Sequence, residues 1–177
     1  MGVISADLIL GLPDFRAAER TFQLLTQVAG RAGRGRLPGR VLVQTYYPDH
    51  YAIRFGAAQD YEGFYEQELK FRRLMHYPPF TALANLVVRD RRLEEAVRKT
   101  RSLEEFFQQQ GDPAVRVLGP VPAPLARLKK DYRFQFLLKS PERRALQELL
   151  GRVSNTTRSG ALEPGDLLVD VDPVSLL

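Results

Sequence analysis

The residues best suited to binding an anion in this 177-residue sequence are three arginines separated by small residues, Arg31, Arg34 and Arg36. They follow Gln27 in the segment QVAGRAGRGR. A guanidinium group presents a planar fork of donors that matches the oxygens of a phosphate or carboxylate. Glycine at positions 30 and 33 allows close approach, because a Cβ there would hold the backbone away from a ligand. The segment therefore predicts an anion-binding loop.

A helix is expected to precede this loop and to fix its position. Apolar residues recur at spacings of three and four before it, which predicts a helix from Asp14 to Ala29. Asp14 is a favourable N-cap, and Gly30 is a natural stop. Upstream, residues 3–10 predict a buried strand and the loop after it, and residues 41–45 predict a second short strand. Because the first strand has so few partners, we expect the sequence to begin inside a larger domain.

The arginine segment resembles the arginine motif of superfamily 2 helicases, in which a glutamine precedes GRxGR. Its flank, LPDFRAAERTFQLLT at residues 12–26, is similar to the PriA family of replication-restart DNA helicases, also called primosomal protein N-prime. Later segments agree and follow the family's order: YPPF at 77–80, GPVPA at 119–123, YRFQ at 132–135 and DVDP at 170–173. The resemblance covers nearly the whole chain.

The resemblance implies the C-terminal part of an ATP-dependent 3'-to-5' DNA helicase that recognises stalled or forked replication structures and restarts replication by primosome assembly. Arg34 would be the arginine finger, and Arg31 a second phosphate or interlobe contact. Gln27 would be a nucleotide or coupling residue, with Gly30 and Gly33 beside the nucleotide. The alternative is a flexible arginine–glycine loop that contacts nucleic-acid phosphates.

The family's cofactors are expected to be held elsewhere. ATP and Mg²⁺ need a phosphate loop of the form GxxxxGK[ST], and the family's zinc needs cysteines, but the sequence contains neither. We therefore expect the phosphate, magnesium and zinc ligands to lie outside this chain. The chain alone is predicted to be inactive as an ATPase.

Strands and helices alternate in the second half. Strands are predicted at 82–88, 115–121, 132–139 and 167–171, with helices after the first and third of them. This order is typical of a ferredoxin-like, split βαβ domain. We predict an α/β protein with a partial RecA-like lobe at 1–58, a helical connector at 59–80, and a ferredoxin-like α+β domain for DNA forks and partners at 81–177.

The predicted helical connector has two sides. Its apolar side is predicted to contain Tyr61, Phe64, Tyr65, Leu69 and Leu74. Its outward charged side is predicted to contain Glu66, Glu68, Lys70, Arg72 and Arg73. The prolines at 78 and 79 end it, because proline cannot continue a helix.

Basic residues gather a second time between residues 116 and 144, eight against two acidic ones. Prolines at 120, 122 and 124 are expected to stiffen a loop that leads to Arg127, Lys129 and Lys130. Arg133 is expected on a polar sheet face with Gln135 and Lys139. A stiff basic loop loses little entropy on contacting a DNA backbone, so we predict DNA binding here. An ordinary solvated hairpin is the alternative.

Two further pairs of residues are candidates for a binding or structural role. Arg143 and Gln147 are four apart and share a helix face. The resemblance implies that they hold the acidic tail of single-stranded DNA-binding protein; a solvent-exposed helix face is the alternative. Asp170 and Asp172 alternate on an expected edge strand but have no supporting ligands for a metal. We expect them to have a structural role, such as pairing with arginines of a neighbouring lobe.

Composition limits the remaining possibilities. The net charge of +5 favours a polyanionic partner, although a GC-rich genome would also enrich arginine. There are no cysteines and two isolated histidines, so no metal site is expected. Without a signal peptide or an apolar run of about 20 residues, we predict a cytoplasmic protein without membrane contact.

The expected partners are forked or single-stranded DNA, the acidic tail of single-stranded DNA-binding protein, and other primosome proteins. The alternative function is a stand-alone ferredoxin-like nucleic-acid-binding module with no ATP-linked role.

Overall fold

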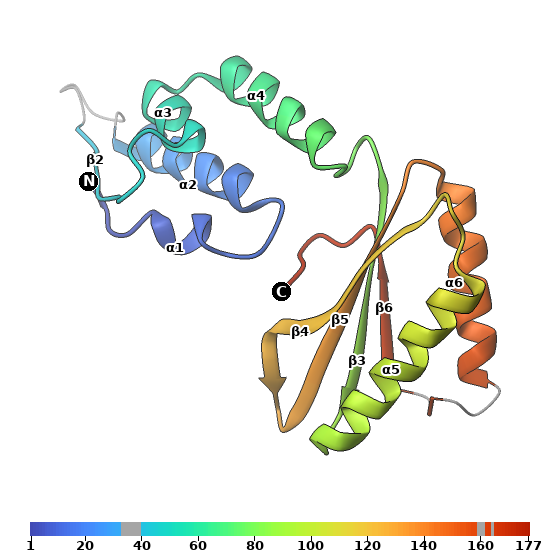
Figure 1. Cartoon of the computed structure of the whole chain (residues 1–177). Helices are drawn as coiled ribbons and strands as arrows, with labels where there is room; N and C mark the ends of the chain where they lie inside the picture. Colours follow the sequence, from blue (N-terminus) through green and yellow to red (C-terminus); the bar gives the residue numbers. More distant parts are fainter. Residues whose placement is uncertain (33–39, 159–161, 164) are drawn as a thin grey trace. The chain divides into compact units, whose positions relative to one another are not determined.

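The computed structural model describes residues 1–32, 40–158, 162–163 and 165–177 (Figure 1). The chain divides into two units, Met1–Met75 and His76–Leu177. The first holds a two-stranded parallel sheet with helices, and the second holds a four-stranded antiparallel sheet with helices. The predicted mixture of α and β structure is therefore confirmed.

The first unit is mostly helical. Its helices are α1 (Asp7–Leu10), α2 (Ala17–Ala32), α3 (Tyr51–Ala58) and α4 (Tyr61–Leu74). Strand β1 (Gly2–Val3) pairs in parallel with β2 (Leu42–Val43). The strand and loop expected at 3–10 are wrong, since the strand ends at Val3 and residues 7–10 form α1. The Asp7 carboxylate accepts hydrogen bonds from Thr45 Oγ1 (2.5 Å) and the Tyr46 N–H (3.0 Å), which fixes the chain where α1 begins.

Helix α2 differs from its prediction at both ends. It begins three residues after Asp14, whose carboxylate accepts from the Arg16 N–H (2.9 Å) and pairs with Arg20 (3.1 Å). It continues through Gly30 to Ala32, so the predicted stop at Gly30 is wrong. A helical glycine costs only about 1 kcal/mol relative to alanine, which packing of the preceding turns can outweigh. Phe22 supplies such packing, stacked on Phe64 of α4 at 4.1 Å between ring centroids.

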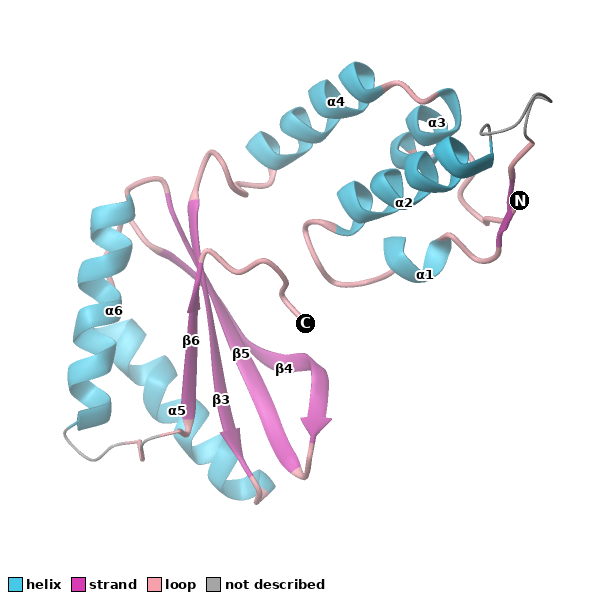
Figure 2. Ribbon diagram, turned by 180° about the vertical axis from the view of Figure 1, so that it is seen from behind, coloured by secondary structure: helices cyan, strands magenta, loops and turns pink. Residues whose placement is uncertain are grey.

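The second unit has the predicted order of strands and helices (Figure 2). Its elements are β3 (Ala82–Asp90), α5 (Leu93–Gln110), β4 (Arg116–Leu128), β5 (Asp131–Ser140), α6 (Arg143–Arg158) and β6 (Leu167–Val171). The strands lie in the order β4-β5-β3-β6. Strand β4 runs through the region expected to be a proline-stiffened loop. Its pairing with β5 shifts register between Leu118 and Val121 and again between Pro122 and Arg127.

Both helices of this unit cover one face of the sheet, as the two ribbon views agree (Figures 1 and 2). Alternate residues of β3 pack beneath them, and the core includes Ala84, Leu86, Val88, Phe136, Leu138, Leu103, Phe107, Leu146 and Leu149. On the opposite face, Leu83, Asn85 and Val87 are also buried. Strand β3 is therefore buried on both faces, and β4 and β6 form the edges of the sheet.

Among the described residues, none of the helices combines the length and the apolar character needed to cross a bilayer.

Candidate functional site

The described part of the arginine segment lies at the end of α2. Gln27, Gly30 and Arg31 are all exposed there. Gln27 and Arg31 are four apart and so share a helix face. A Cβ on Gly30 would meet no described atom within 4 Å. The helix thus presents the Gln27 amide and the Arg31 guanidinium on one side. Packing among the described residues gives no reason for a glycine at position 30. Gly33 and Arg34 lie outside the described residues.

The second predicted site forms the tip of the β4–β5 hairpin. Leu128 pairs with Asp131, which leaves Lys129 and Lys130 as a two-residue turn. Their φ angles are +50° and +82°, and both residues are exposed. Positive φ at both central positions is the geometry of a type I′ turn, which Asn-Gly adopts most readily. Here the turn carries two ammonium groups instead.

Two arginines flank this turn. The Arg127 guanidinium lies over the Tyr132 ring, 5.2 Å from its centroid, a cation–π contact across the hairpin. Arg133 donates from Nη1 to the Leu125 carbonyl oxygen at 3.3 Å, so its side chain extends back towards β4. The hairpin therefore gathers Arg127, Lys129 and Lys130 at its exposed end, with Arg133 beside them and less exposed.

Lys139 lies on the predicted polar sheet face, but it is buried there rather than offered to DNA. Phe136 and Leu138 pack beneath the helices, so the predicted alternation is correct and Lys139 lies on the other face. Its side chain is covered by Tyr77, with Nζ 3.4 Å from the ring centroid. Burial, together with repulsion from Arg116, lowers the pKa of Lys139 from 10.5 to about 8.

This pKa makes a testable prediction about stability. Between about pH 8 and 10 the unfolded chain still binds a proton that folded Lys139 has released, so the free energy of unfolding rises with pH in this interval. We predict that Lys139→Met removes this rise and that the exposed control Lys129→Met retains it. Urea unfolding of the three proteins at about pH 8 and about pH 9.5 measures the difference. An equal rise in all three would show that Lys139 does not titrate in this range.

The predicted pair on α6 is arranged around an ion pair. Arg143 donates from Nη1 to Asp172 Oδ2 at 2.7 Å, and the two side chains are 58% and 42% exposed. Gln147 lies exposed one turn further along the helix. Asp172 was expected to have a structural role, and its ion pair is formed within its own unit rather than with the suggested neighbouring lobe. Asp170 and Asp172 were predicted to lie on one face of the same edge strand. Asp172 is not part of that strand, because β6 ends at Val171 and Asp172 has a φ of +52°.

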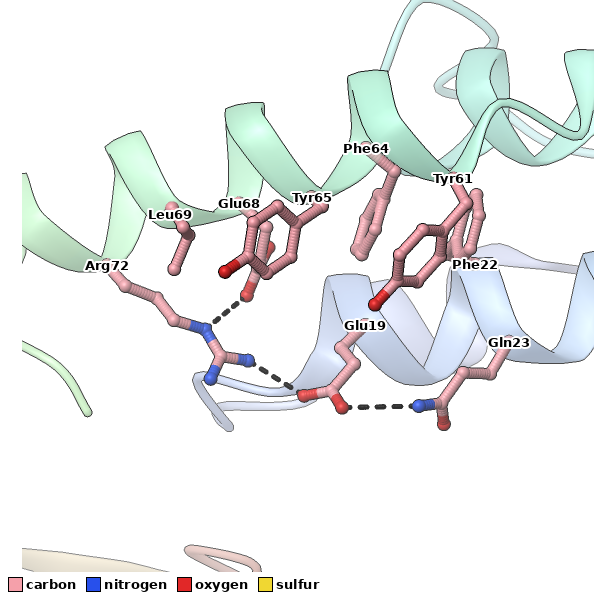
Figure 3. A pocket seen from close by; sticks show the side chains of 9 residues that line it. All are labelled: Glu19, Phe22, Gln23, Tyr61, Phe64, Tyr65, Glu68, Leu69 and Arg72. Atoms are coloured by element: carbon pink, nitrogen blue, oxygen red, sulfur yellow. Dashed lines mark hydrogen bonds and ion pairs between the residues drawn. The ribbon is translucent and has the colours of Figure 1, made fainter. Parts of the chain in front are cut away.

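A pocket between α2 and α4 was not predicted from the sequence (Figure 3). Its cavity volume is about 230 Å³, with aromatic side chains at one end and charged side chains at the other. Phe22 and Phe64 form a buried stack, while Tyr61 and Tyr65 are 65% and 51% exposed. The predicted apolar side of α4 is therefore only partly buried.

The charged end of this pocket corrects another expectation. Glu68 and Arg72, predicted to point outward, lie inward and pair with each other at 2.7 Å (Figure 3). Arg72 also pairs with Glu19 of α2 at 2.8 Å, and Glu68 accepts from the Tyr51 hydroxyl at 2.7 Å. Burial raises the pKa of Tyr51, and the hydrogen bond to Glu68 raises it further. Only the four-residue spacing of Glu68 and Arg72 hinted at this arrangement.

Within the described part of the chain, no group of three or more His, Cys, Asp or Glu side chains is placed to hold a metal ion.

Comparison with known proteins points to one family. The family model for the Primosomal protein N C-terminal domain matches residues 73–174. The chain is 42% identical over 153 residues to the Replication restart protein PriA of Bacillus subtilis, covering 86% of the chain and 19% of that protein. It is 38% identical over 176 residues to the protein of the same name from Synechocystis, covering 99% of the chain and 21% of the relative.

A third relative, the Replication restart protein PriA of Haemophilus influenzae, is 37% identical over 179 residues, covering 99% of the chain and 24% of that protein. The chain thus spans about a fifth to a quarter of the length of these relatives.

Proposed function

Because the chain belongs to the PriA family of replication restart proteins, we propose that it is the C-terminal part of an ATP-dependent 3'-to-5' DNA helicase acting at stalled or forked replication structures. In this proposal the first unit is part of a RecA-like lobe. The second unit is a ferredoxin-like domain, supported by its order of strands and helices and by the strand order β4-β5-β3-β6. Primosome assembly is the proposed outcome of its binding.

The end of α2 is the proposed link to ATP. Guanidinium and amide donors fit phosphate oxygens, and Gln27 and Arg31 present both from one helix face. ATP with Mg²⁺, held by residues outside this chain, would supply the phosphoryl group that is transferred to water. Arg34 would neutralise the charge that develops on it, an effect worth about 10³–10⁵ in rate. Arg31 would hold a second phosphate or the facing lobe. Zinc is likewise assigned to ligands outside this chain.

The variant Gly30→Ala tests this proposal, because its effect on folding and its effect on ATP hydrolysis are expected to have opposite signs. Its Cβ would meet no described atom, so Gly30→Ala should stabilise this chain by about 0.5–1 kcal/mol through helix propensity. In the complete helicase the same change should lower DNA-stimulated ATP hydrolysis, because the added methyl group keeps the backbone from the nucleotide. Urea unfolding and an ATPase assay measure the two effects.

The neighbouring change Gln23→Ala, also on α2, serves as the control that should leave hydrolysis unchanged. Full activity of the Gly30→Ala helicase would contradict a nucleotide-facing role and would favour a nucleic-acid-binding module with no ATP-linked role.

The hairpin tip is the proposed DNA contact, and its turn geometry is the observation that carries the proposal. Lys129 and Lys130 occupy left-handed conformations that cost a residue with a Cβ roughly 1–2 kcal/mol each. Asn-Gly would form the same turn more cheaply. A fold that needed only a turn gains nothing from lysine here. Two ammonium groups projected from a hairpin end suit contacts with successive backbone phosphates.

Replacement of the two turn residues is expected to change stability and DNA affinity in opposite directions, so the two effects can be told apart. We predict that the double variant Lys129→Asn, Lys130→Gly is more stable than the wild type by about 1 kcal/mol, because it relieves the turn. The same variant should bind forked DNA roughly tenfold more weakly at low salt, because two cations no longer neutralise backbone phosphates. Urea unfolding and fluorescence anisotropy with a labelled fork measure the two quantities.

A matched variant removes two cations elsewhere, Arg98→Gln with Arg101→Gln on α5, and should leave fork affinity nearly unchanged. If the turn variant binds forks as tightly as the wild type, the hairpin is not the DNA contact.

The Arg143–Asp172 pair supports a proposed partner. An ion pair this exposed contributes little stability, so an external carboxylate can replace Asp172 at small cost. Gln147 offers an amide one turn away. We therefore propose that an acidic peptide terminus, such as the tail of single-stranded DNA-binding protein, docks here.

A further inference from the structure

Strand β6 forms an open edge of the sheet in the second unit. It is the last strand in the order β4-β5-β3-β6, and in the described part of the chain no strand pairs with its outer side. Its sequence, LLVDV, contains neither proline nor lysine, the residues that usually protect an edge from further pairing.

The pairing with β3 shows which backbone groups face outward. The Asp172 N–H donates to the Leu83 carbonyl oxygen, and the Arg89 N–H donates to the Asp166 carbonyl oxygen, each at 2.8 Å. In an antiparallel ladder, hydrogen-bonded residues alternate along each strand. The even-numbered residues of β6 therefore bond to β3. The N–H and C=O groups of Leu167, Val169 and Val171 point away from the sheet.

The side chains of this edge have a definite pattern. Val169 and Val171 lie on the face that carries the helices and are 46% and 42% exposed. Asp170 lies on the other face, opposite Asn85, and is exposed. Its carboxylate forms no hydrogen bond or ion pair with any described residue, although its backbone pairs with β3. Asp166 and Asp172 differ from it, because Lys99 and Arg143 neutralise them.

We propose that β6 accepts an extended segment of a partner protein as a fifth strand, by β-strand addition. The outward backbone groups would pair with the segment. Its alternate apolar side chains would cover Val169 and Val171, and a lysine or arginine of the segment would face Asp170. A second copy of β6 fits this edge poorly. In a two-fold pair centred on Val169, the two Asp170 carboxylates become diagonal neighbours on one face and repel.

A designed strand tests the proposal on the full chain. The probe is a capped peptide of about nine residues in which valine and lysine alternate. Amide hydrogen exchange, followed residue by residue by NMR, should show that the peptide protects Leu167, Val169 and Val171. The even-numbered amides should change little, because they are already bonded to β3.

Two variants identify the contact. Val169→Pro removes an outward N–H that the ladder with β3 does not use, and should weaken peptide binding by about tenfold or more. Val169→Thr retains the N–H and is the matched control. Asp170→Lys should weaken binding of the lysine peptide roughly two- to fivefold and strengthen binding of a peptide with glutamate in place of lysine. This exchange of preference does not depend on the proline variant folding.

Either of two results would overturn the proposal. One is the absence of added protection at the outward amides with the peptide in excess. The other is protection of the same amides that grows with protein concentration alone, which would assign the edge to a second copy of the chain.

Discussion

Burial of alternate residues of β3 and β5 beneath α5 and α6 is the constraint on which the second unit depends. A shift of one residue in this pairing would move either Leu86 of β3 or Phe136 and Leu138 of β5 out of the core, so the register is strongly fixed. The pairing of β5 with β4 places Lys129 and Lys130 at the hairpin turn, and β6, which pairs only with β3 among the described strands, lies at the edge. The proposed contacts with DNA and with a partner strand therefore lie on the two strands that flank this packed pair.

The first unit is held by a different interaction. Arg72 joins Glu68 on its own helix to Glu19 of α2, and Glu68 is also bonded to Tyr51 of α3. Buried charges are tolerated only when their partners are in place, so this network ties three helices together. Through Glu19 the network includes helix α2, whose last two turns carry Gln27 and Arg31. The position of the proposed ATP contact thus depends on how firmly α2 is held.

Periodicity predicts most elements, and the errors have physical causes. The alternation from Tyr132 to Lys139 predicts β5, because Phe136 and Leu138 on one of its faces are buried beneath the helices. The helix continues past Gly30 because tertiary packing outweighs the weak propensity of a single glycine. Prolines favour a loop before Arg127, yet they are accommodated in β4 because an edge strand needs only half of its N–H groups. Glu68 could not be placed, since its network includes Glu19, far away in the sequence.

The central claim is that the turn lysines exist to neutralise nucleic-acid phosphates. Its most direct test is the affinity of the chain for a forked DNA measured across a range of salt concentrations. Plotted as log K against log salt, the slope should be shallower by roughly two when Lys129 and Lys130 are replaced by asparagine and glycine, about one for each phosphate that is no longer neutralised. An unchanged slope, with the turn replaced and the fold intact, would contradict the claim.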